Sequence, residues 1–411
     1  MASKGKDTKS GPIDVLCMAT KDENCDFKPM RLQRRAVGDY DILMAMQYCG
    51  ICHTDLHISA GHTAALTGKH YPCVPGHELS GIVIDVGPKV TKFKVGDHAG
   101  VGCMVDSCLK CSACLRGEEQ KCTSQIATYG GKDKSGRAAT YPVGIHTYGG
   151  YTDKFVVNER FGIVIPKSYD LKYAGPVMCS GVTLYSPMKK YNAKAGSRIA
   201  VVGIGCLGQM GIKIGKALGC TVTAITRSPA KVEFAKKCGA DAVLISTDAA
   251  QMKKAAKSFD LVLNTIPSEH DYSIYTNLVA NRGKQVMLGL NSGLVAGMVV
   301  DGITCGSSKV TGSGIGSILE TQEVIDLCAK HQIYPEIKVI SVTEINYAYE
   351  QLDRCNESGE RFVLDLANTL NDSAFEKCTA PPPKFGTPTP PLGLGTIVGA
   401  ICGLFCSCKW C

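Results

Sequence analysis

The chain has 411 residues, a formal net charge of +8 and 45% hydrophobic residues. This length exceeds one ordinary core and predicts roughly two or three domains. Basic residues lie among acidic ones along the whole chain, which excludes a nucleic-acid-binding stripe and favours a small phosphate-bearing ligand. In a long chain without a secretory signal, 22 cysteines indicate thiols and metal ligands rather than a disulfide scaffold.

The first part of the chain is predicted to be a disordered arm followed by a β-rich domain. Residues 1–11 are polar and precede no apolar run, so we expect no secretory signal, no membrane span and a cytoplasmic protein. From Ile13 to about Asp170, short apolar runs alternate with glycines, as in Ser80 to Gly87. This pattern predicts a turn-rich, mainly antiparallel domain with few helices.

After Pro187 the pattern changes, because strand-length apolar runs alternate with helix-length segments. Such alternation predicts an α/β domain with a doubly wound parallel sheet. The expected strands are 198–202, 221–225, 242–245, 261–264, 285–288 and 309–311, and the expected helices include 207–218 and 230–237.

The end of the chain is expected to return to the first domain. A helix over 320–331, then a strand, a helix and a strand over 339–366, fit a chain that passes back to the β-rich part. Prolines gather after residue 370, which predicts a linker. The predicted division is a catalytic domain of 12–180 completed by 318–370, a nucleotide-binding domain of 181–317, and a linker and tail of 371–411.

A glycine-rich turn follows the strand 198–202 and opens the next helix. In a dinucleotide-binding turn, the first glycine permits the tight turn, the second lets the backbone approach a pyrophosphate, and the third allows close packing of helix and strand. The alternative is an ordinary turn, which the strand and helix on either side disfavour. The predicted cofactor contacts in this turn are Gly203, Ile204, Gly205, Cys206, Leu207 and Gly208.

About twenty residues further on, an acid would bind the ribose 2′-hydroxyl of NAD. Hydroxyls and cations stand there instead, and such groups suit a 2′-phosphate, which an aspartate would repel. We therefore predict NADP(H) as cofactor; the alternative is that the cations belong to a solvated helix start. The predicted contacts are Thr226, Arg227, Ser228 and Lys231.

Four cysteines stand close together in one loop, with the spacing C-x2-C-x2-C-x7-C. Four thiolates complete a tetrahedral shell around Zn²⁺ and leave no open position, so we expect a structural zinc site. Disulfides are the alternative, which the absence of a secretory signal and the strain of short loops disfavour. These residues are Cys108, Cys111, Cys114 and Cys122, and Cys103 just upstream falls outside the spacing and is expected to be a buried thiol.

Three more segments carry candidate metal ligands, namely Cys52, His77 with Glu78, and Cys179. Taken singly, such residues are more often core thiols or hydrogen-bonded histidines than ligands. Together with the four-cysteine loop and the glycine turn, they occur in the order seen in medium-chain zinc-dependent alcohol dehydrogenases. The chain resembles this family over about residues 12–370.

The segments Thr147 to Tyr151 and Gly312 to Ser317 are most similar to the cinnamyl alcohol dehydrogenase-like branch of that family. The resemblance implies a GroES-like catalytic domain, a Rossmann nucleotide domain and a homodimer paired through the nucleotide domains. It also implies two zinc ions per chain and reversible hydride transfer between primary alcohols and NADP(H). Aliphatic, aromatic and terpenoid alcohols remain alternatives as substrates.

The resemblance also assigns roles to the separated ligands. It implies that Cys52, His77 and Cys179 bind the catalytic zinc with a fourth position open to substrate, and that Glu78 is an alternate ligand. Two thiolates and an imidazole are a chemically sensible set for such an open site. Polyol dehydrogenases commonly place a carboxylate at the position of Cys179, so this cysteine favours simple alcohols over sugars.

Further roles concern the proton and the cofactor. Zinc lowers the pKa of a bound alcohol, and Thr54 can hydrogen-bond the alcohol oxygen. The resemblance implies a proton relay from Thr54 through the cofactor ribose to His57. Histidine suits the outer end of such a relay because it titrates near neutral pH. The alternative is that His57 is a solvated surface residue. Thr183 is expected to pack against the nicotinamide, and Gly312 and Ser313 are also assigned to the cofactor site.

The tail from Leu392 to Cys408 has no charged residue and ends in several cysteines. One hypothesis is a membrane tether or S-acylated anchor on a proline-rich arm, and the alternative is a tail without such a role. Two rival functions also remain at this stage. They are a non-catalytic NADPH-binding protein on the same fold, which the intact ligand set disfavours, and a membrane-associated scaffold.

Overall fold

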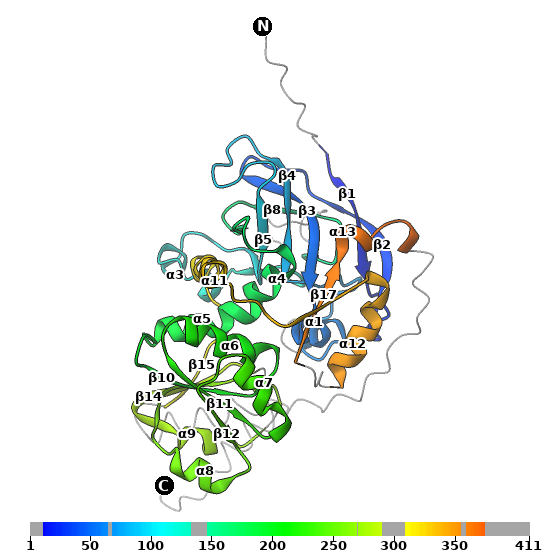
Figure 1. Ribbon diagram of the computed structural model, residues 1–411. Helices are drawn as coiled ribbons and strands as arrows, with labels where there is room; N and C mark the ends of the chain where they lie inside the picture. The colour runs from blue at the N-terminus through cyan, green and yellow to red at the C-terminus, as the bar shows by residue number, and fades with distance from the viewer. Residues whose placement is uncertain are drawn as a thin grey trace, which may run out of the picture. The chain divides into compact units, whose positions relative to one another are not determined.

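The computed structural model describes residues 11–64, 68–132, 146–268, 270–289, 309–354 and 359–374. Its Cα atoms group into two compact units, each with its own large sheet (Figure 1). The first unit holds the described parts of 11–186, 205–210 and 314–374, and the second holds those of 187–204 and 211–313. The expected arm, apart from Gly11, and the tail from residue 375 onward lie outside the described residues.

The first unit is built on a seven-stranded sheet in which β8 pairs with β3 beside the order β16-β17-β3-β4-β5-β9. Neighbouring strands run antiparallel except β16 and β17, which run parallel. This agrees with the antiparallel domain expected from the sequence. The strands are β3 (Asp41–Gly50), β4 (Leu79–Val86), β5 (His98–Val101), β8 (Lys154–Asn158), β9 (Ile163–Val164), β16 (Ile337–Ile340) and β17 (Arg361–Asp365).

Two two-stranded antiparallel sheets and several helices complete the first unit. The described helices before Asp170 are short, which fits the scarcity of helical periodicity in that part of the sequence. The two small sheets pair β1 (Ile13–Ala19) with β2 (Lys28–Arg34), and β6 (Met104–Asp106) with β7 (Ile126–Ala127). The helices are α1 (His53–Ser59), α3 (Ser112–Leu115), η1 (Glu119–Lys121), α4 (Leu171–Pro176), the π-helical turn η2 (Val177–Gly181), α5 (Val182–Lys190), α11 (Ile318–His331), η4 (Val342–Glu344), α12 (Ile345–Asp353) and α13 (Leu366–Thr369).

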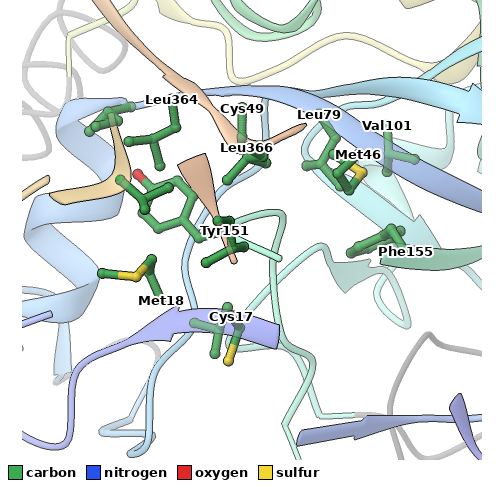
Figure 2. Packing of buried hydrophobic residues seen from close by; sticks show 14 of the residues in the cluster. Cys17, Met18, Met46, Cys49, Leu79, Val101, Tyr151, Phe155, Leu364 and Leu366 are labelled. Atoms are coloured by element: carbon green, nitrogen blue, oxygen red, sulfur yellow. The ribbon is translucent and has the colours of Figure 1, made fainter. Parts of the chain in front are cut away.

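The core of the first unit draws on segments that are far apart in the sequence. Figure 2 shows Tyr151 among side chains from several segments, including Cys17 and Met18 of β1, Cys49 of β3 and Leu366 of α13. All of these side chains are buried, and they belong to one hydrophobic cluster. Residues near both ends of the described chain are therefore fixed in one core, close to where the functional segments lie.

The second unit contains a six-stranded parallel sheet with the order β12-β11-β10-β13-β14-β15. This confirms the doubly wound sheet expected from the sequence, whose order reverses on either side of the first strand. The strands are β10 (Arg198–Val202), β11 (Thr221–Thr226), β12 (Ala242–Ile245), β13 (Phe259–Asn264), β14 (Val279–Met287) and β15 (Val310–Gly312), and the helices between them are α6 (Cys206–Ala217), η3 (Pro229–Lys231), α7 (Val232–Lys237), α8 (Ala249–Lys254) and α9 (Ser273–Thr276).

Two expected elements differ from the structure. The helix expected over 230–237 begins instead as the 3₁₀ turn η3, in which the Lys231 N–H donates to the Ser228 carbonyl three residues back, before α7 continues. The strand expected over 285–288 is longer, because β14 already begins at Val279. Its first half carries exposed polar side chains, so a search for apolar runs did not predict that half as a strand.

One negative observation concerns membranes. Among the described residues, no helix has the length and apolar character needed to cross a bilayer.

Candidate metal centres

The four-cysteine loop brings its sulfur atoms together. The ligand atoms of Cys108, Cys111, Cys114 and Cys122 all lie within 4.8 Å of one another. Backbone N–H groups point at the sulfurs, since Cys111 N–H donates to Cys108 Sγ at 3.3 Å. Such bonds, foremost those from the backbone of Lys110 and Cys111, lower the pKa of the Cys108 thiol to about 6. Four free thiols in this arrangement fit a closed, structural zinc ion.

The second cluster collects residues from three distant segments. The ligand atoms of Cys52, His77, Glu78 and Cys179 lie within 4.8 Å of one another, and all four residues are buried. The Sγ atoms of Cys52 and Cys179 are 4.0 Å apart, and Nε2 of His77 is 3.2 Å from Cys179 Sγ. The structure therefore brings together the ligands that the sequence only suggested through family order.

Close backbone packing makes this convergence possible. Cys52 immediately precedes α1, His77 and Glu78 precede β4, and Cys179 lies within the π-helical turn η2. Gly175 of α4 approaches so closely that a Cβ atom there would meet the Glu78 carbonyl at 2.2 Å. Gly50, at the end of β3, likewise leaves the space that the Glu78 carboxylate occupies, because a Cβ would lie 1.9 Å from Oε2.

Asp55 orients His77, although it was not among the residues expected at the site. Its Oδ1 lies 3.0 Å from His77 Nδ1, which leaves Nε2 free to face Cys179. The same carboxylate accepts the N–H of Cys52 at 2.7 Å, as in a capping box at the start of α1. The three-residue spacing from Cys52 to Asp55 is the signal that could have identified it. A carboxylate behind a histidine ligand fixes the ring and its tautomer.

The electrostatics of the cluster favour a cation. A hydrogen bond from Cys179 is the main cause that holds the pKa of Cys52 well below its usual range, against the effect of burial. Burial raises the pKa of Glu78 to about 7, while Arg361, whose Nη2 lies 3.4 Å from Oε1, lowers it. Neither carboxylate oxygen of Glu78 has a hydrogen-bond partner among the described residues. A buried thiolate and an unsatisfied carboxylate at one point suit a metal ion.

Cys103 was expected to be a buried thiol outside the four-cysteine spacing, and the structure leaves it partly exposed. Its side chain also hydrogen-bonds Cys179, which lowers the pKa of Cys103. Spacing alone could not place it there, because it belongs to neither cysteine pattern.

The residues expected to move a proton lie on α1. The Cys52 Sγ and the Thr54 Oγ1 are 3.7 Å apart, so Thr54 borders the cluster. His57 lies one turn further along and places its Nδ1 3.1 Å from Nδ1 of His62. Burial, followed by the charges of His53 and His62, lowers the pKa of His57 to about 4. The ring is therefore neutral at pH 7 and stays neutral well below it.

The glycine turn has the backbone geometry that its sequence requires. Gly203 has φ of +87°, and a Cβ there would lie 2.9 Å from Thr265 Oγ1. A Cβ at Gly205, in contrast, would meet no described atom within 4 Å, so the turn leaves the space that a close approach of a pyrophosphate requires. The turn therefore fits a dinucleotide.

The segment after β11 supplies cations and hydroxyls but no acid. Lys231 donates from Nζ to the Ile204 carbonyl at 3.0 Å, which brings a positive charge to the glycine turn. The Thr226 hydroxyl accepts the Ser228 N–H at 3.1 Å and shapes the loop that carries Arg227. These groups suit a 2′-phosphate.

The remaining assigned residues lie on separate elements. Thr183 is buried on α5, four residues after Cys179. Gly312 ends β15, and the Ser313 N–H donates to the Met287 carbonyl at 3.2 Å.

Two protein-family models match the chain. An alcohol dehydrogenase GroES-like domain covers residues 38–167, and a zinc-binding dehydrogenase domain covers residues 206–330. Among curated relatives, 8-hydroxygeraniol dehydrogenase of Catharanthus roseus is 39% identical over 88% of this chain and 98% of its own length. The NADP-dependent alcohol dehydrogenase C 1 of Mycolicibacterium smegmatis is 40% identical over 82% of this chain and 93% of its own length.

Solved structures of alcohol dehydrogenases are also similar to the chain. A cinnamyl alcohol dehydrogenase of Sorghum bicolor aligns with a TM-score of 0.80 and 38% identity over 88% of this chain and all of its own length. The CAD of Helicobacter pylori, solved with NADP(H), aligns with a TM-score of 0.77 and 34% identity over 87% of this chain and 99% of its own length.

The two cysteine clusters lead to a prediction about zinc content. We expect the purified protein to hold about two zinc ions per chain, and Cys114→Ser and Cys52→Ser to hold about one each, because each variant loses one thiolate ligand. Elemental analysis after gel filtration measures this. Cys220→Ser, a buried thiol whose sulfur donates to the Lys194 carbonyl, is the matched control and should keep both ions. Two ions in Cys114→Ser would contradict the structural site.

Proposed function

The chain belongs to the zinc-binding, medium-chain alcohol dehydrogenases, and from this premise we propose that it interconverts primary alcohols and aldehydes with NADP(H) at the cluster of Cys52, His77 and Cys179. The observation that carries the proposal is the convergence of these three side chains, with Glu78, within 4.8 Å. A non-catalytic NADPH-binding protein would not need this buried ligand set.

The chemistry divides between the bound groups and the chain. Zinc at this site supplies a Lewis acid that polarises the oxygen of an alcohol or aldehyde, and NADP(H) accepts or donates the hydride at its nicotinamide. The chain holds the metal through two thiolates and the Nε2 of His77, with Asp55 fixing the ring. Glu78 lies within reach as an alternate ligand.

We assign the proton pathway to α1. The Thr54 hydroxyl hydrogen-bonds the substrate oxygen and accepts its proton during alcohol oxidation. With NADP(H) bound, the cofactor ribose would connect Thr54 to His57, which would hold the proton at the outer end of α1. Nδ1 of His57 lies 3.1 Å from Nδ1 of His62, so one of these two rings donates to the other. Thr183 packs against the nicotinamide, and Gly312 and Ser313 contact the cofactor.

The substrate is a simple primary alcohol or its aldehyde. Relatives include dehydrogenases named for 8-hydroxygeraniol and for cinnamyl alcohol, one a terpenoid and the other an aromatic alcohol. The chain has a single tryptophan, Trp410, which lies outside the described residues, so none of the described residues carries an indole. A panel of aliphatic, aromatic and terpenoid aldehydes, assayed with NADPH and NADH, ranks these classes.

We further propose a cytoplasmic homodimer paired through the nucleotide domains, with a domain division at 12–180 completed by 318–370 and at 181–317. For the tail beyond residue 370 the tether and the inert segment remain two proposals. Fractionation of the intact chain and of a chain ending at residue 370 separates them. Membrane recovery of the intact chain alone supports the tether, and equal recovery in the soluble fraction overturns it.

The central test of the proposed function is Cys52→Ser. Loss of one thiolate ligand should abolish turnover of alcohol and aldehyde, while NADPH binding, measured by fluorescence titration, persists because the glycine turn is untouched. Cys220→Ser is again the control and should keep full activity. Unchanged turnover in Cys52→Ser would remove the catalytic assignment.

The cofactor preference depends on the cations after β11. Arg227→Ala should weaken NADPH binding roughly tenfold or more, the size of a lost hydrogen bond to a charged group, and leave NADH binding unchanged. Arg198→Ala is the control. Arg198 is the first residue of β10, at the end of that strand away from the glycine turn, and it forms an ion pair with Asp260. Equal losses for both cofactors in Arg227→Ala would refute a 2′-phosphate contact.

The pH profile tests the relay. With a pKa lowered to about 4, His57 stays neutral and able to accept a proton from pH 7 down to about pH 4. His62→Gln removes a cation that helps to lower this pKa, so the acid limb of alcohol oxidation should move to higher pH. His57→Gln should lose roughly 100-fold in rate.

Steady-state kcat/KM from pH 4 to 9 measures both effects. His331→Gln, an exposed residue at the end of α11, is the control and should leave the profile unchanged. An acid limb that stays in place in His62→Gln would count against His57 as the proton acceptor.

A further inference from the structure

Asp55 contacts three further hydrogen-bond donors besides His77, the histidine that it orients. The carboxylate is fully buried. Its Oδ1 faces His77 Nδ1 at 3.0 Å and the Gly76 N–H at 3.2 Å. Its Oδ2 accepts the Cys52 N–H at 2.7 Å and the Tyr151 hydroxyl at 3.3 Å. A carboxylate has about four lone-pair sites, so these four donors match its capacity. The buried hydroxyl of Tyr129 also interacts with Asp55 but makes no hydrogen bond of normal geometry among the described residues.

Tyr151 is itself held by a second tyrosine. Its hydroxyl lies 3.3 Å from the Tyr349 hydroxyl, on α12. Because Tyr151 donates its one hydroxyl hydrogen to Asp55, Tyr349 must be the donor between the two. Both tyrosine rings are fully buried. The centroid of the Phe27 ring lies 4.6 Å from that of Tyr349 and 6.2 Å from that of Tyr151. The order Tyr349, Tyr151, Asp55, His77 is therefore one directed chain of hydrogen bonds.

The segment that carries Tyr151 is fixed against the irregular segment that leads to His77. The N–H of Gly149 donates to the Val74 carbonyl at 2.7 Å, and the N–H of Tyr151 donates to the Pro75 carbonyl at 3.1 Å. A Cβ at Gly149 would lie 2.3 Å from that Pro75 carbonyl oxygen, so only glycine permits this approach.

From the other side, the fully buried Arg34 donates to the carbonyls of Tyr148 and Gly149 at 3.0 and 2.7 Å. The position of the Tyr151 hydroxyl is thus set by backbone contacts that do not depend on Asp55.

We propose that Tyr151, supported by Tyr349, is a positioning residue of the candidate catalytic zinc site, acting on His77 through Asp55. This inference rests on the proposed function, in that His77 is taken as a zinc ligand. Loss of the Tyr151 hydroxyl removes one of the four hydrogen bonds to the buried Asp55 carboxylate, which then turns toward another donor or attracts water. The His77 ring loses its fixed orientation, and zinc affinity falls.

The test is the zinc affinity of the full-length protein with single hydroxyls removed. Tyr151→Phe should weaken the catalytic-site zinc by roughly tenfold, at the low end of effects from groups behind the ligands. Tyr349→Phe should weaken it less, because Asp55 keeps its four donors. Competition with a chromogenic zinc chelator gives the dissociation constants, and the visible spectrum of the Co²⁺-substituted protein reports the ligand geometry.

Tyr169→Phe is the matched control. Tyr169 is also fully buried, but its hydroxyl donates to the Ile333 carbonyl at 2.6 Å, within the same unit and without contact to Asp55. It should leave both the zinc affinity and the Co²⁺ spectrum as in the parent chain. The four-cysteine zinc serves as the internal measure of folding in every variant.

The outcomes separate the two proposals. A parent chain that holds no zinc beyond the four-cysteine site overturns the proposed function and this inference with it. A parent chain with both ions, and a Tyr151→Phe variant with unchanged affinity and Co²⁺ spectrum, overturns the positioning role alone. If Tyr151→Phe fails to retain the four-cysteine zinc, Tyr349→Phe decides, and affinity equal to that of Tyr169→Phe overturns the role.

Discussion

Two side chains that can carry a negative charge, Cys52 and Glu78, lie at one buried point of the first unit, and their charges must be balanced there. The thiol of Cys52 is held in a state that favours its anion, and Glu78 brings a carboxylate to the same place, where Arg361 and His77 are the opposing positive charges. Burying such groups costs several kcal/mol each unless they are paired. A divalent cation between them removes this cost, so the site and its metal stabilise each other.

The two metal centres differ in how the chain builds them. The four-cysteine loop is local, because its ligands lie within fifteen residues and backbone N–H groups of the same loop point at the sulfurs. It is complete without further residues and suits a structural ion. The other cluster joins segments more than a hundred residues apart, and its position depends on close backbone approaches at Gly50 and Gly175. In the proposed function, the two thiols and one imidazole of the second cluster hold the ion and leave a position for substrate.

The carboxylate of Asp55 connects the ligand cluster to the core. It caps the start of α1, receives the N–H before His77 and ends a chain of tyrosine hydroxyls that reaches α12. A single buried group thus fixes Cys52, His77 and the segment of Tyr151 relative to one another. The geometry of the site is therefore tied to the packing of elements drawn from both ends of the described chain.

The sequence alone determined what depends on local pattern. Alternating runs predicted the parallel sheet, and the position of β10 and of β12 was predicted to the residue, because apolar strands bounded by turns are recognisable without their neighbours. The cysteine spacing and the glycine turn likewise follow from residues close in the chain, whereas the separated ligands could be grouped only through resemblance to a family.

Only the tertiary structure decided the groups that act across the fold. Asp55, Arg361 and Tyr151 acquire their roles through side-chain contacts with residues that are not their sequence neighbours. The pKa of His57 is low because of burial and of two other histidines, which no ordinary pKa anticipates. The physical reason is the same in each case: burial and hydrogen bonding depend on distances in space, and these are set by packing rather than by order along the chain.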